Sequence, residues 1–342
     1  MSTRDRADTQ LAHMCNTLEM AEQPSDTSKT QLATQAAELY YLQQLDMESI
    51  GKRLNVSRSS VSRLLQTARD RGIVEFRINR SSDRIQNLQE RIRELFSISA
   101  NVFEVAEDAT ADERLETVAS ETAKKLGNFL RPGITVGLAW GSTISAVSRY
   151  MHQYPVGNSI VVQLNGAGND HSTGLTYSGE ILNRFGGNLG AQVIHFPVPA
   201  FFDDPSAKQA MWRERSTRRI LDIQARIDLA IFGLGRIDAE VPSQVYVAGY
   251  LEQSELEKLG EQNVVGDIAT VFFREDGSWE DIGLNQRASG PSLDQLRKTP
   301  KRLCVVSGVS KLQALKGALA GGFITDLFID DLTAEKLLET SS

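Results

Sequence analysis

The sequence predicts an α/β protein in two parts, a small helical domain near the N-terminus and a larger domain built on an open, mostly parallel sheet. Two observations carry this prediction. Between residues 30 and 71 apolar side chains recur at helical spacing, whereas from residue 134 onward short β-rich runs alternate with helical stretches. The length of 342 residues also exceeds one average domain, which favours two.

Composition excludes several classes of protein. The hydrophobic fraction of 41% is ordinary for a globular chain, yet no run of about 18 apolar residues is present to span a membrane. The N-terminus lacks the apolar segment of a signal peptide, so we expect the protein in the cytoplasm. Cys15, Cys304 and four scattered histidines predict neither a disulfide framework nor a metal site.

Three helices are expected in the N-terminal part. Residues 1–29 are polar and without sustained periodicity, which predicts a flexible arm, and a helical domain follows over residues 30–80. Ser57 is placed to cap the third helix and Gly72 to end it, and residues 73–78 alternate like a short strand. The apolar faces of the three helices are formed by Leu32, Ala36 and Leu39, by Met47, Ile50 and Leu54, and by Val61, Leu64, Leu65 and Ala68.

The segment from Met47 to Arg71 reads as a helix, a tight turn and a second helix. Residues 51–80 hold eight basic and two acidic residues, although the whole chain has a net charge of −7, and such a basic module suits DNA phosphates. Small hydroxyl residues let a helix approach the major groove, and arginine can grip a guanine edge. The alternative is a helical hairpin with a solvated polar face. The residues predicted to contact DNA are Lys52, Ser57, Arg58, Ser59, Ser60, Ser62, Arg63, Gln66 and Arg69.

Residues 81–99 are expected to form a linker helix. Ile85, Leu88, Ile92 and Leu95 are spaced by three, four and three residues, a short heptad-like stripe. This stripe either joins two copies of the chain or packs against its own domain, and the sequence favours neither.

Residues 100–342 are expected to form the α/β domain. Several of its strand-like runs are apolar nearly throughout, which is typical of parallel strands covered on both faces. The segments between them are long enough for crossover helices. The expected strands are residues 134–140, 160–165, 192–196, 229–234, 269–273, 303–307 and 326–330.

Three loops follow these strands at the position where open α/β sheets bind ligands. In the first, Gly141 permits close backbone approach, and Ser142 and Thr143 open a helix whose free N–H groups suit an anion; a plain strand-to-helix turn is the alternative. The second contains Asn165 and Gly166 and is a weaker signal. The third, residues 232–238, lacks the last glycine of a dinucleotide fingerprint, so we expect neither NAD nor another cofactor, and we expect its Asp238 to cap a helix.

Two later residues suit a sugar phosphate. Asp267 precedes a strand and offers a carboxylate to sugar hydroxyls, while Lys311 follows another strand and offers a positive charge to a phosphate. Either residue alone is more often an exposed charge or a cap.

Taken together in this order and spacing, these segments resemble the SorC family (SorC/DeoR type) of bacterial sugar-sensing repressors, from about residue 30 to the C-terminus. The segments that carry the resemblance are VSRSSVSRLLQTARDRGIVEF, GLAWGSTI, QLNGAG, GDIATVFF and SGVSKLQALKGAL. The resemblance implies a winged helix-turn-helix and an effector domain similar to sugar-phosphate isomerases.

Function and site residues also follow from the resemblance. It implies a dimer or tetramer that represses a sugar or nucleoside catabolic operon and is released from operator DNA by a phosphorylated sugar. Gly141, Ser142 and Thr143 match the family's phosphate loop, Asp267 its acidic residue and Lys311 its late lysine. Ser307 departs from the family's glycine. Some members hold a Schiff-base lysine where this chain has Ser142, so that chemistry is not expected here.

An enzyme is the second hypothesis. Asp267 with Lys311 could imitate the acid–base pair of a sugar-phosphate isomerase or deaminase. However, the sequence shows no compact acid–base constellation, and an enzyme of this fold needs no DNA-binding domain. A metal- or redox-responsive regulator is disfavoured by the scattered histidines and cysteines. We therefore expect a regulator and not an enzyme.

Overall fold

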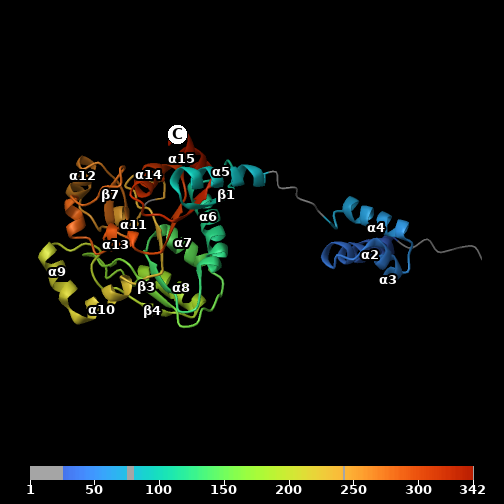
Figure 1. Ribbon diagram of the computed structural model, residues 1–342, viewed down its shortest axis with the longest axis horizontal. Helices are drawn as coiled ribbons and strands as arrows, with labels where there is room; N and C mark the ends of the chain where they lie inside the picture. The colour runs from blue at the N-terminus through green and yellow to red at the C-terminus, as the bar shows by residue number, and fades with distance from the viewer. Residues whose placement is uncertain (1–25, 75–80, 242, 342) are drawn as a thin grey trace, which may run out of the picture. The chain divides into compact units, whose positions relative to one another are not determined.

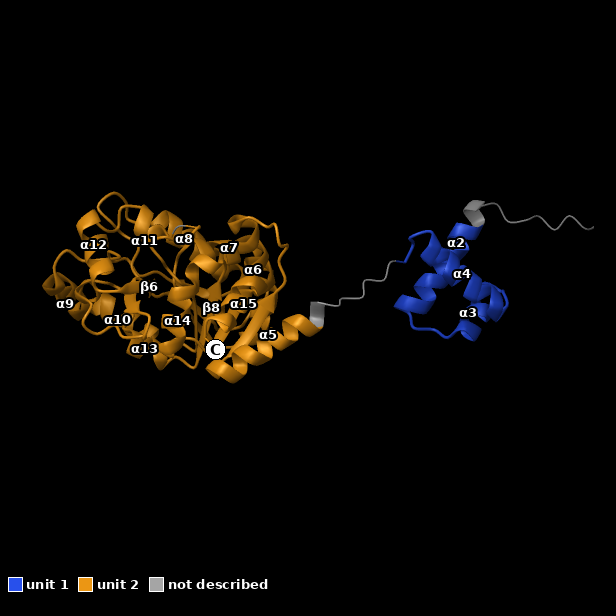
Figure 2. Ribbon diagram, turned by 90° about the horizontal axis from the view of Figure 1, so that it is seen from above, with its two compact units in different colours: residues 1–79 blue, residues 80–342 orange. Residues whose placement is uncertain are grey.

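The structure is a computed structural model that describes residues 26–74, 81–241 and 243–341. The chain forms two compact units, residues 1–79, here called the head, and residues 80–342, here called the body (Figure 2). Residues 1–25 of the arm predicted over residues 1–29, and most of the strand-like pattern at residues 73–78 and hence any wing, lie outside the described residues, whereas residues 26–29 are helical and not part of an arm. None of the helices in the described ranges has the length and apolar character needed to cross a lipid bilayer.

The head consists of short helices around a small apolar core (Figure 1). Its first helix begins four residues before the predicted start, because the extra turn is polar and leaves no trace in an apolar pattern. Ala36, Ile50 and Val61 are completely buried, and Leu65 nearly so. The elements are α2 (Asp26–Ala37), a π-helical turn η1 (Glu38–Leu42), α3 (Met47–Leu54) and α4 (Arg58–Asp70).

The turn between α3 and α4 is fixed by backbone geometry. Asn55 has a φ of 54°, and a side chain at Gly51 would place its Cβ 2.8 Å from the carbonyl oxygen of Val56. As predicted, Ser57 caps α4, with its Oγ accepting from the N–H of Ser60 at 3.1 Å. Gly72 ends the helix as predicted, with a φ of 68°.

The body is built on a seven-stranded sheet in which all neighbouring strands are parallel, which confirms the predicted architecture. The strand order is β1-β9-β8-β5-β2-β3-β4. Every residue of β9 is buried, as expected for a strand covered on both faces. The strands are β1 (Ser99–Phe103), β2 (Thr135–Leu138), β3 (Ile160–Gln163), β4 (Gln192–Ile194), β5 (Leu229–Gly233), β8 (Lys301–Val306) and β9 (Asp326–Asp330).

Helices connect and cover these strands (Figure 1). Helices α6, α7 and α8 pack side by side, while α5 and α15 pack together next to β1. The longer helices are α5 (Ser81–Phe96), α6 (Ala111–Lys125), α7 (Ser142–Tyr150), α8 (Leu175–Leu189), α9 (Pro205–Arg213), α10 (Arg215–Gln224), α12 (Gln253–Glu261), α14 (Leu312–Ala320) and α15 (Asp331–Glu339). The shorter ones are η2 (Leu126–Phe129), α11 (Gln244–Val247), η3 (Gly283–Gln286), α13 (Leu293–Arg297) and η4 (Val309–Lys311).

One predicted strand of the sheet was wrong. The run at residues 269–273 becomes β7 (Val271–Arg274), which pairs antiparallel with β6 (Val264–Ile268) in a separate hairpin. Ala269 and Thr270 join the two strands with φ values of 49° and 70°, the positive values that a two-residue hairpin turn requires. Strands β6 and β1 were not predicted, because each mixes polar and apolar residues.

Helix α5 packs against its own domain. Leu88 and Ile92 are buried in the core of the body, Ile85 is half-buried, and Leu95 remains 48% exposed. Arg84 pairs with Asp331 at 2.9 Å and also with Glu335 on α15. Of the two interpretations of the heptad-like stripe, packing within the chain therefore describes most of it.

Candidate functional site

A cavity opens where the direction of the sheet reverses. From β2 the chain steps through β3 to β4 at one edge, whereas β5 lies on the other side of β2 and leads through β8 to β9. The loops after β2 and β5 therefore separate at their carboxyl ends, which is the usual ligand position in such sheets. The cavity is lined by residues 139–144, Asn165, residues 233–235, Ser243, Val245, Asp267, Ala269, Thr270 and Lys311.

The N-terminus of α7 forms one wall of this cavity. Gly141 precedes the helix with a φ of 154°, and no side chain caps the helix end. The backbone N–H groups of the first turn and the helix dipole make such an end favourable for an anion. Thr143 is the second residue of α7, and a Cβ at Gly233 would come within 3.1 Å of the Cβ of Thr143. Glycine at the end of β5 thus lets the two loops approach each other.

Asp267 forms the opposite wall and is only 4% exposed. Its Oδ1 accepts from the hydroxyl of Tyr246 at 2.8 Å and its Oδ2 from the N–H of Thr270 at 3.1 Å. Burial raises the pKa of this carboxyl to about 6, although the bonds from Tyr246 and Thr270 and the charge of Lys311 act in the opposite direction. A Cβ at Gly235 would lie 1.8 Å from Oδ1, so only glycine fits beside the carboxylate.

Lys311 lies at the end of η4 and is also 4% exposed. Its Nζ is 3.5 Å from the Oγ1 of Thr143. Burial lowers the pKa of the ammonium group, and the nearby Cys304 and Asp267 oppose that effect. A buried cation beside a free helix N-terminus can bind a phosphate with little competing solvent.

Asn165 offers a further polar group to the cavity. The side chain is 1% exposed, and its Oδ1 has no hydrogen-bond partner among the described residues. An unsatisfied buried acceptor is costly, which makes a ligand hydroxyl a favourable partner.

In the head, five of the nine predicted DNA-contacting residues share one exposed surface of α4. Ser59, Ser62, Arg63, Gln66 and Arg69 are exposed along α4, opposite its buried face. Gln66 accepts from Arg69 at 2.9 Å and donates to Asp70 at 2.7 Å. This face therefore combines hydroxyl, amide and guanidinium groups, the types that read base edges.

The remaining predicted DNA contacts lie around the start of α4 and on α3. Ser57 and Ser60 bond to each other near the cap, Arg58 is exposed beside them, and Lys52 on α3 pairs with Glu48 at 2.9 Å.

Comparison with known proteins assigns the chain to a family. Residues 82–339 match the family model described as "Putative sugar-binding domain". The deoxyribonucleoside regulator of Bacillus subtilis is 30% identical over 315 residues, which cover 92% of this chain and 99% of that protein. The chain belongs to the SorC family of sugar-binding transcriptional regulators.

Solved structures agree with this assignment. The crystal structure of "a domain of a possible sugar-binding transcriptional regulator" from Arthrobacter aurescens is 48% identical, with a TM-score of 0.70 over 74% of this chain and 97% of that one. The full-length sorbitol operon regulator from Klebsiella pneumoniae has a TM-score of 0.73 at 23% identity, over 92% of this chain and 99% of that one, and shows the shared fold.

Six of the seven predicted effector residues of this SorC-family regulator line the cavity. Gly166 does not, because its N–H is bonded to the Oγ of Ser289 at 2.9 Å and a Cβ there would lie 2.2 Å from the carbonyl oxygen of Val198. The six that meet are Gly141, Ser142, Thr143, Asn165, Asp267 and Lys311.

Several residues in or next to the cavity of the regulator were missed from the sequence. Tyr246 gives no motif and reaches Asp267 from 21 positions away. Gly233 and Gly235 belong to the loop at residues 232–238, which was considered from the sequence only as a dinucleotide-binding motif. The signal that could have identified them is the position of two glycines, separated by one residue, at the end of a predicted strand. Asp238 in that loop does not cap a helix as predicted, but pairs with Arg236 at 2.5 Å.

Proposed function

We propose that this regulator represses a sugar or nucleoside catabolic operon by binding operator DNA through α4, and that a phosphorylated sugar in the cavity weakens that binding. The observation that carries the proposal is the placement of a free helix N-terminus, a buried lysine and a buried carboxylate around one cavity. The first two suit a phosphate, and Asp267 with Asn165 suits sugar hydroxyls.

The names of the relatives support a sugar or nucleoside pathway as the source of the effector. They include regulators of deoxyribonucleosides in Bacillus subtilis, of erythritol catabolism in Brucella abortus and of the sorbitol operon in Klebsiella pneumoniae. We propose that the chain acts in the cytoplasm as a homo-oligomer, a dimer or tetramer, whose paired heads bind spaced half-sites. The effector then favours an arrangement of subunits that no longer fits the half-site spacing.

A ligand screen tests the effector half of this proposal. Full-length protein is melted with a panel of phosphorylated sugars and the corresponding free sugars, because a ligand of the native state raises the melting temperature. At least one phosphorylated sugar should raise it, and its free sugar should do so far less. Lys311→Ala should abolish the shift, whereas Lys298→Ala, which removes an exposed charge on the body, should retain it. A shift that survives unchanged in Lys311→Ala would remove this lysine from the site.

Enzymatic turnover is the competing function. Asp267 and Lys311, which would form the acid–base pair of such an enzyme, line the same cavity, so turnover and not ligand binding separates the two functions. The same panel, followed for isomerisation or release of ammonia, should show no turnover. Conversion at ordinary enzymatic rates would contradict the regulator-only view.

A further inference from the structure

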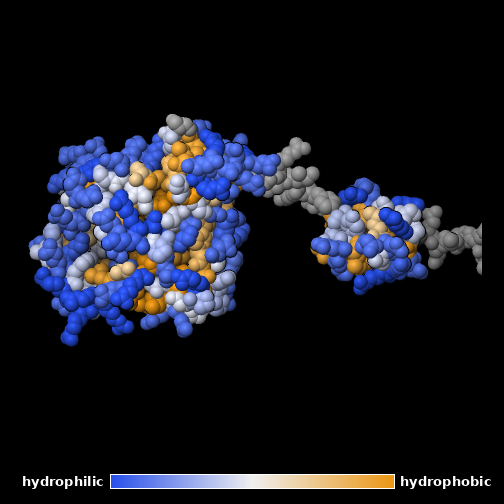
Figure 3. Space-filling view, viewed as in Figure 1, coloured by the Kyte–Doolittle hydropathy of each residue, from blue (hydrophilic) through white to orange (hydrophobic). Residues whose placement is uncertain are grey.

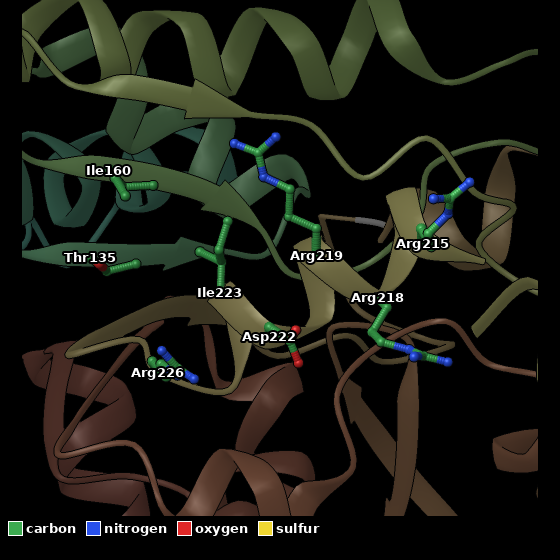
Figure 4. A pocket seen from close by; sticks show the side chains of 8 residues that line it. All are labelled: Thr135, Ile160, Arg215, Arg218, Arg219, Asp222, Ile223 and Arg226. Carbon is green, nitrogen blue, oxygen red and sulfur yellow. The ribbon is translucent and has the colours of Figure 1, made fainter. Parts of the chain in front are cut away.

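A second concave site lies on the body, away from the effector cavity (Figure 4). Its floor includes Thr135 and Ile160, the first residues of β2 and β3, together with Ile223 of α10. It is therefore at the amino ends of these strands, whereas the effector cavity is at the carboxyl ends. Its volume is about 490 Å³, within the range of small-molecule pockets.

Four arginines surround this floor. Arg215, Arg218 and Arg219 project from the first turns of α10 and Arg226 from just beyond its end (Figure 4). All four are exposed, and none forms an ion pair with a carboxylate in the part of the chain that the structure describes. Elsewhere in the body arginines do pair, as Arg114 with Asp330 and Arg274 with Asp281. Asp222 is the one carboxylate in the lining, so four positive charges face a single negative charge at one place on an acidic chain.

The position of three of these arginines conflicts with helix electrostatics. The N-terminus of α10 carries the positive end of the helix dipole, and the acidic residue next to its first turn is Glu214 at the N-cap. Cations at this end of a helix are unfavourable. Where a natural sequence departs from such an electrostatic preference, the position is often part of a functional site. A bound anion would compensate both the guanidinium groups and the helix end.

Helices α10 and α5 lie at different edges of the body's sheet. Helix α5, which follows the head in the chain, packs at the β1 edge of the sheet, whereas α10 packs on β3 near the other edge. Figures 1 and 2 both show the two helices on opposite sides of the body, and Figure 3 shows hydrophilic side chains over α9 and α10.

We propose that this arginine-lined surface binds a small organic phosphate with at least two negative charges, of the nucleoside diphosphate class, as a second ligand. Guanidinium groups bind phosphate oxygens bidentately, and the four groups here are all arginines, never lysines. The two isoleucines of the floor offer apolar contact to a base or similar flat group.

Calorimetric titration of the full chain with ADP, pyrophosphate and adenosine tests the proposal. Wild-type protein should bind ADP more tightly than pyrophosphate, and adenosine weakly or not at all. Arg218→Ala/Arg219→Ala should weaken ADP binding at least about tenfold. The matched control, Arg91→Ala/Lys298→Ala, removes the same charge elsewhere on the body and should bind ADP as wild type does.

Two further arms separate this site from the others. Lys311→Ala, which disables the effector cavity, should still bind ADP with unchanged affinity. The arginine double variant should keep the wild-type circular dichroism spectrum and the wild-type oligomer mass in light scattering. The proposal is overturned if wild-type protein binds neither ADP nor pyrophosphate at millimolar concentration, or if the double variant binds ADP normally. It is also overturned if the double variant changes only the oligomer mass or the affinity for duplex DNA.

Discussion

At the scale of single residues, the proposed effector cavity depends on how Asp267 is held. Its carboxylate is buried among a tyrosine hydroxyl, a backbone N–H and a glycine that leaves room for it. The hairpin turn that presents this N–H has positive φ at Ala269 and Thr270, which for a β-branched residue is strained. Such strain is typical of sites where a precise arrangement of polar groups matters more than stability.

The raised pKa of Asp267 predicts a pH-dependent stability. The folded value of about 6 lies above the ordinary value of 3.8, so the unfolded chain releases this proton first and the folded state loses stability as pH rises from about 4 to 6. Asp267→Asn removes this loss. Relative to wild type, the variant should therefore gain about 2 kcal/mol in unfolding free energy between pH 4.5 and 7.5.

Denaturant unfolding followed by tryptophan fluorescence measures this difference, since all three tryptophans, Trp140, Trp212 and Trp279, lie in the body. Asp238→Asn is the control, because the hydrogen bond with Arg236 lowers the pKa of Asp238. The difference in unfolding free energy between this variant and wild type should therefore change with pH in the opposite direction. A stability gap between Asp267→Asn and wild type that is the same at both pH values would contradict the account.

Single residues were predictable from sequence where their role is local. Ser57 and Gly72 are recognisable because a cap acts within three or four residues of its own position. The cavity residues after strands, such as Ser142 and Lys311, were predictable because the carboxyl ends of parallel strands meet at one edge. Tyr246 was not, because its partner is fixed only by the tertiary fold.

At the scale of elements, helix α5 gives a direct test of packing. Ile92 is fully buried in the body's core, whereas Leu95 on the same stripe is about half exposed. Ile92→Ala should therefore lower the unfolding free energy of the body by about 2–5 kcal/mol, and Leu95→Ala by less than about 1 kcal/mol. Denaturant unfolding measures both. If Leu95→Ala instead dissociates the oligomer, the stripe also serves as an interface between copies.

The turn between α3 and α4 is a second element with a sharp requirement. Gly51→Ala should force the carbonyl of Val56 to move and loosen the helix pair. Hydrogen exchange of the full chain, read by mass spectrometry, should show faster exchange in residues 47–70 and no change in residues 82–339. Asn55→Gly is the matched control, because glycine adopts the positive φ at this position more easily and should leave exchange unchanged or slower. Equal protection of residues 47–70 in Gly51→Ala and wild type would show that the turn tolerates a side chain.

Most strands could be predicted because buried parallel strands are continuous apolar runs. The pairing of β7 could not, because its direction is set by the turn at Ala269 and Thr270, and neither residue type signals positive φ. Strand β1 lies at the edge of the sheet, where only Val102 and Phe103 are buried, so its pattern is weak.

At the scale of the whole molecule, the proposed function requires that ligand binding in the body changes the free energy of DNA binding by the head. The proposed effector cavity lies entirely in the body and the predicted DNA-contacting residues lie entirely in the head. By linkage, the effector must weaken operator binding by the same factor by which operator weakens effector binding. Arg63→Ala should therefore lose affinity for the operator. It should bind the effector at least as tightly as DNA-free wild type does, and calorimetric titration with the effector measures that affinity.

The most direct test of the account is the affinity of the full chain for its selected operator duplex, measured by fluorescence anisotropy at one salt concentration with and without saturating phosphorylated sugar. Saturating effector should weaken operator binding by wild type about 5- to 150-fold, the usual range of allosteric coupling. Lys311→Ala should bind the operator as wild type does and lose less than about twofold under the same effector concentration. An operator affinity that the effector leaves unchanged in wild type, or weakens equally in Lys311→Ala, would contradict the account.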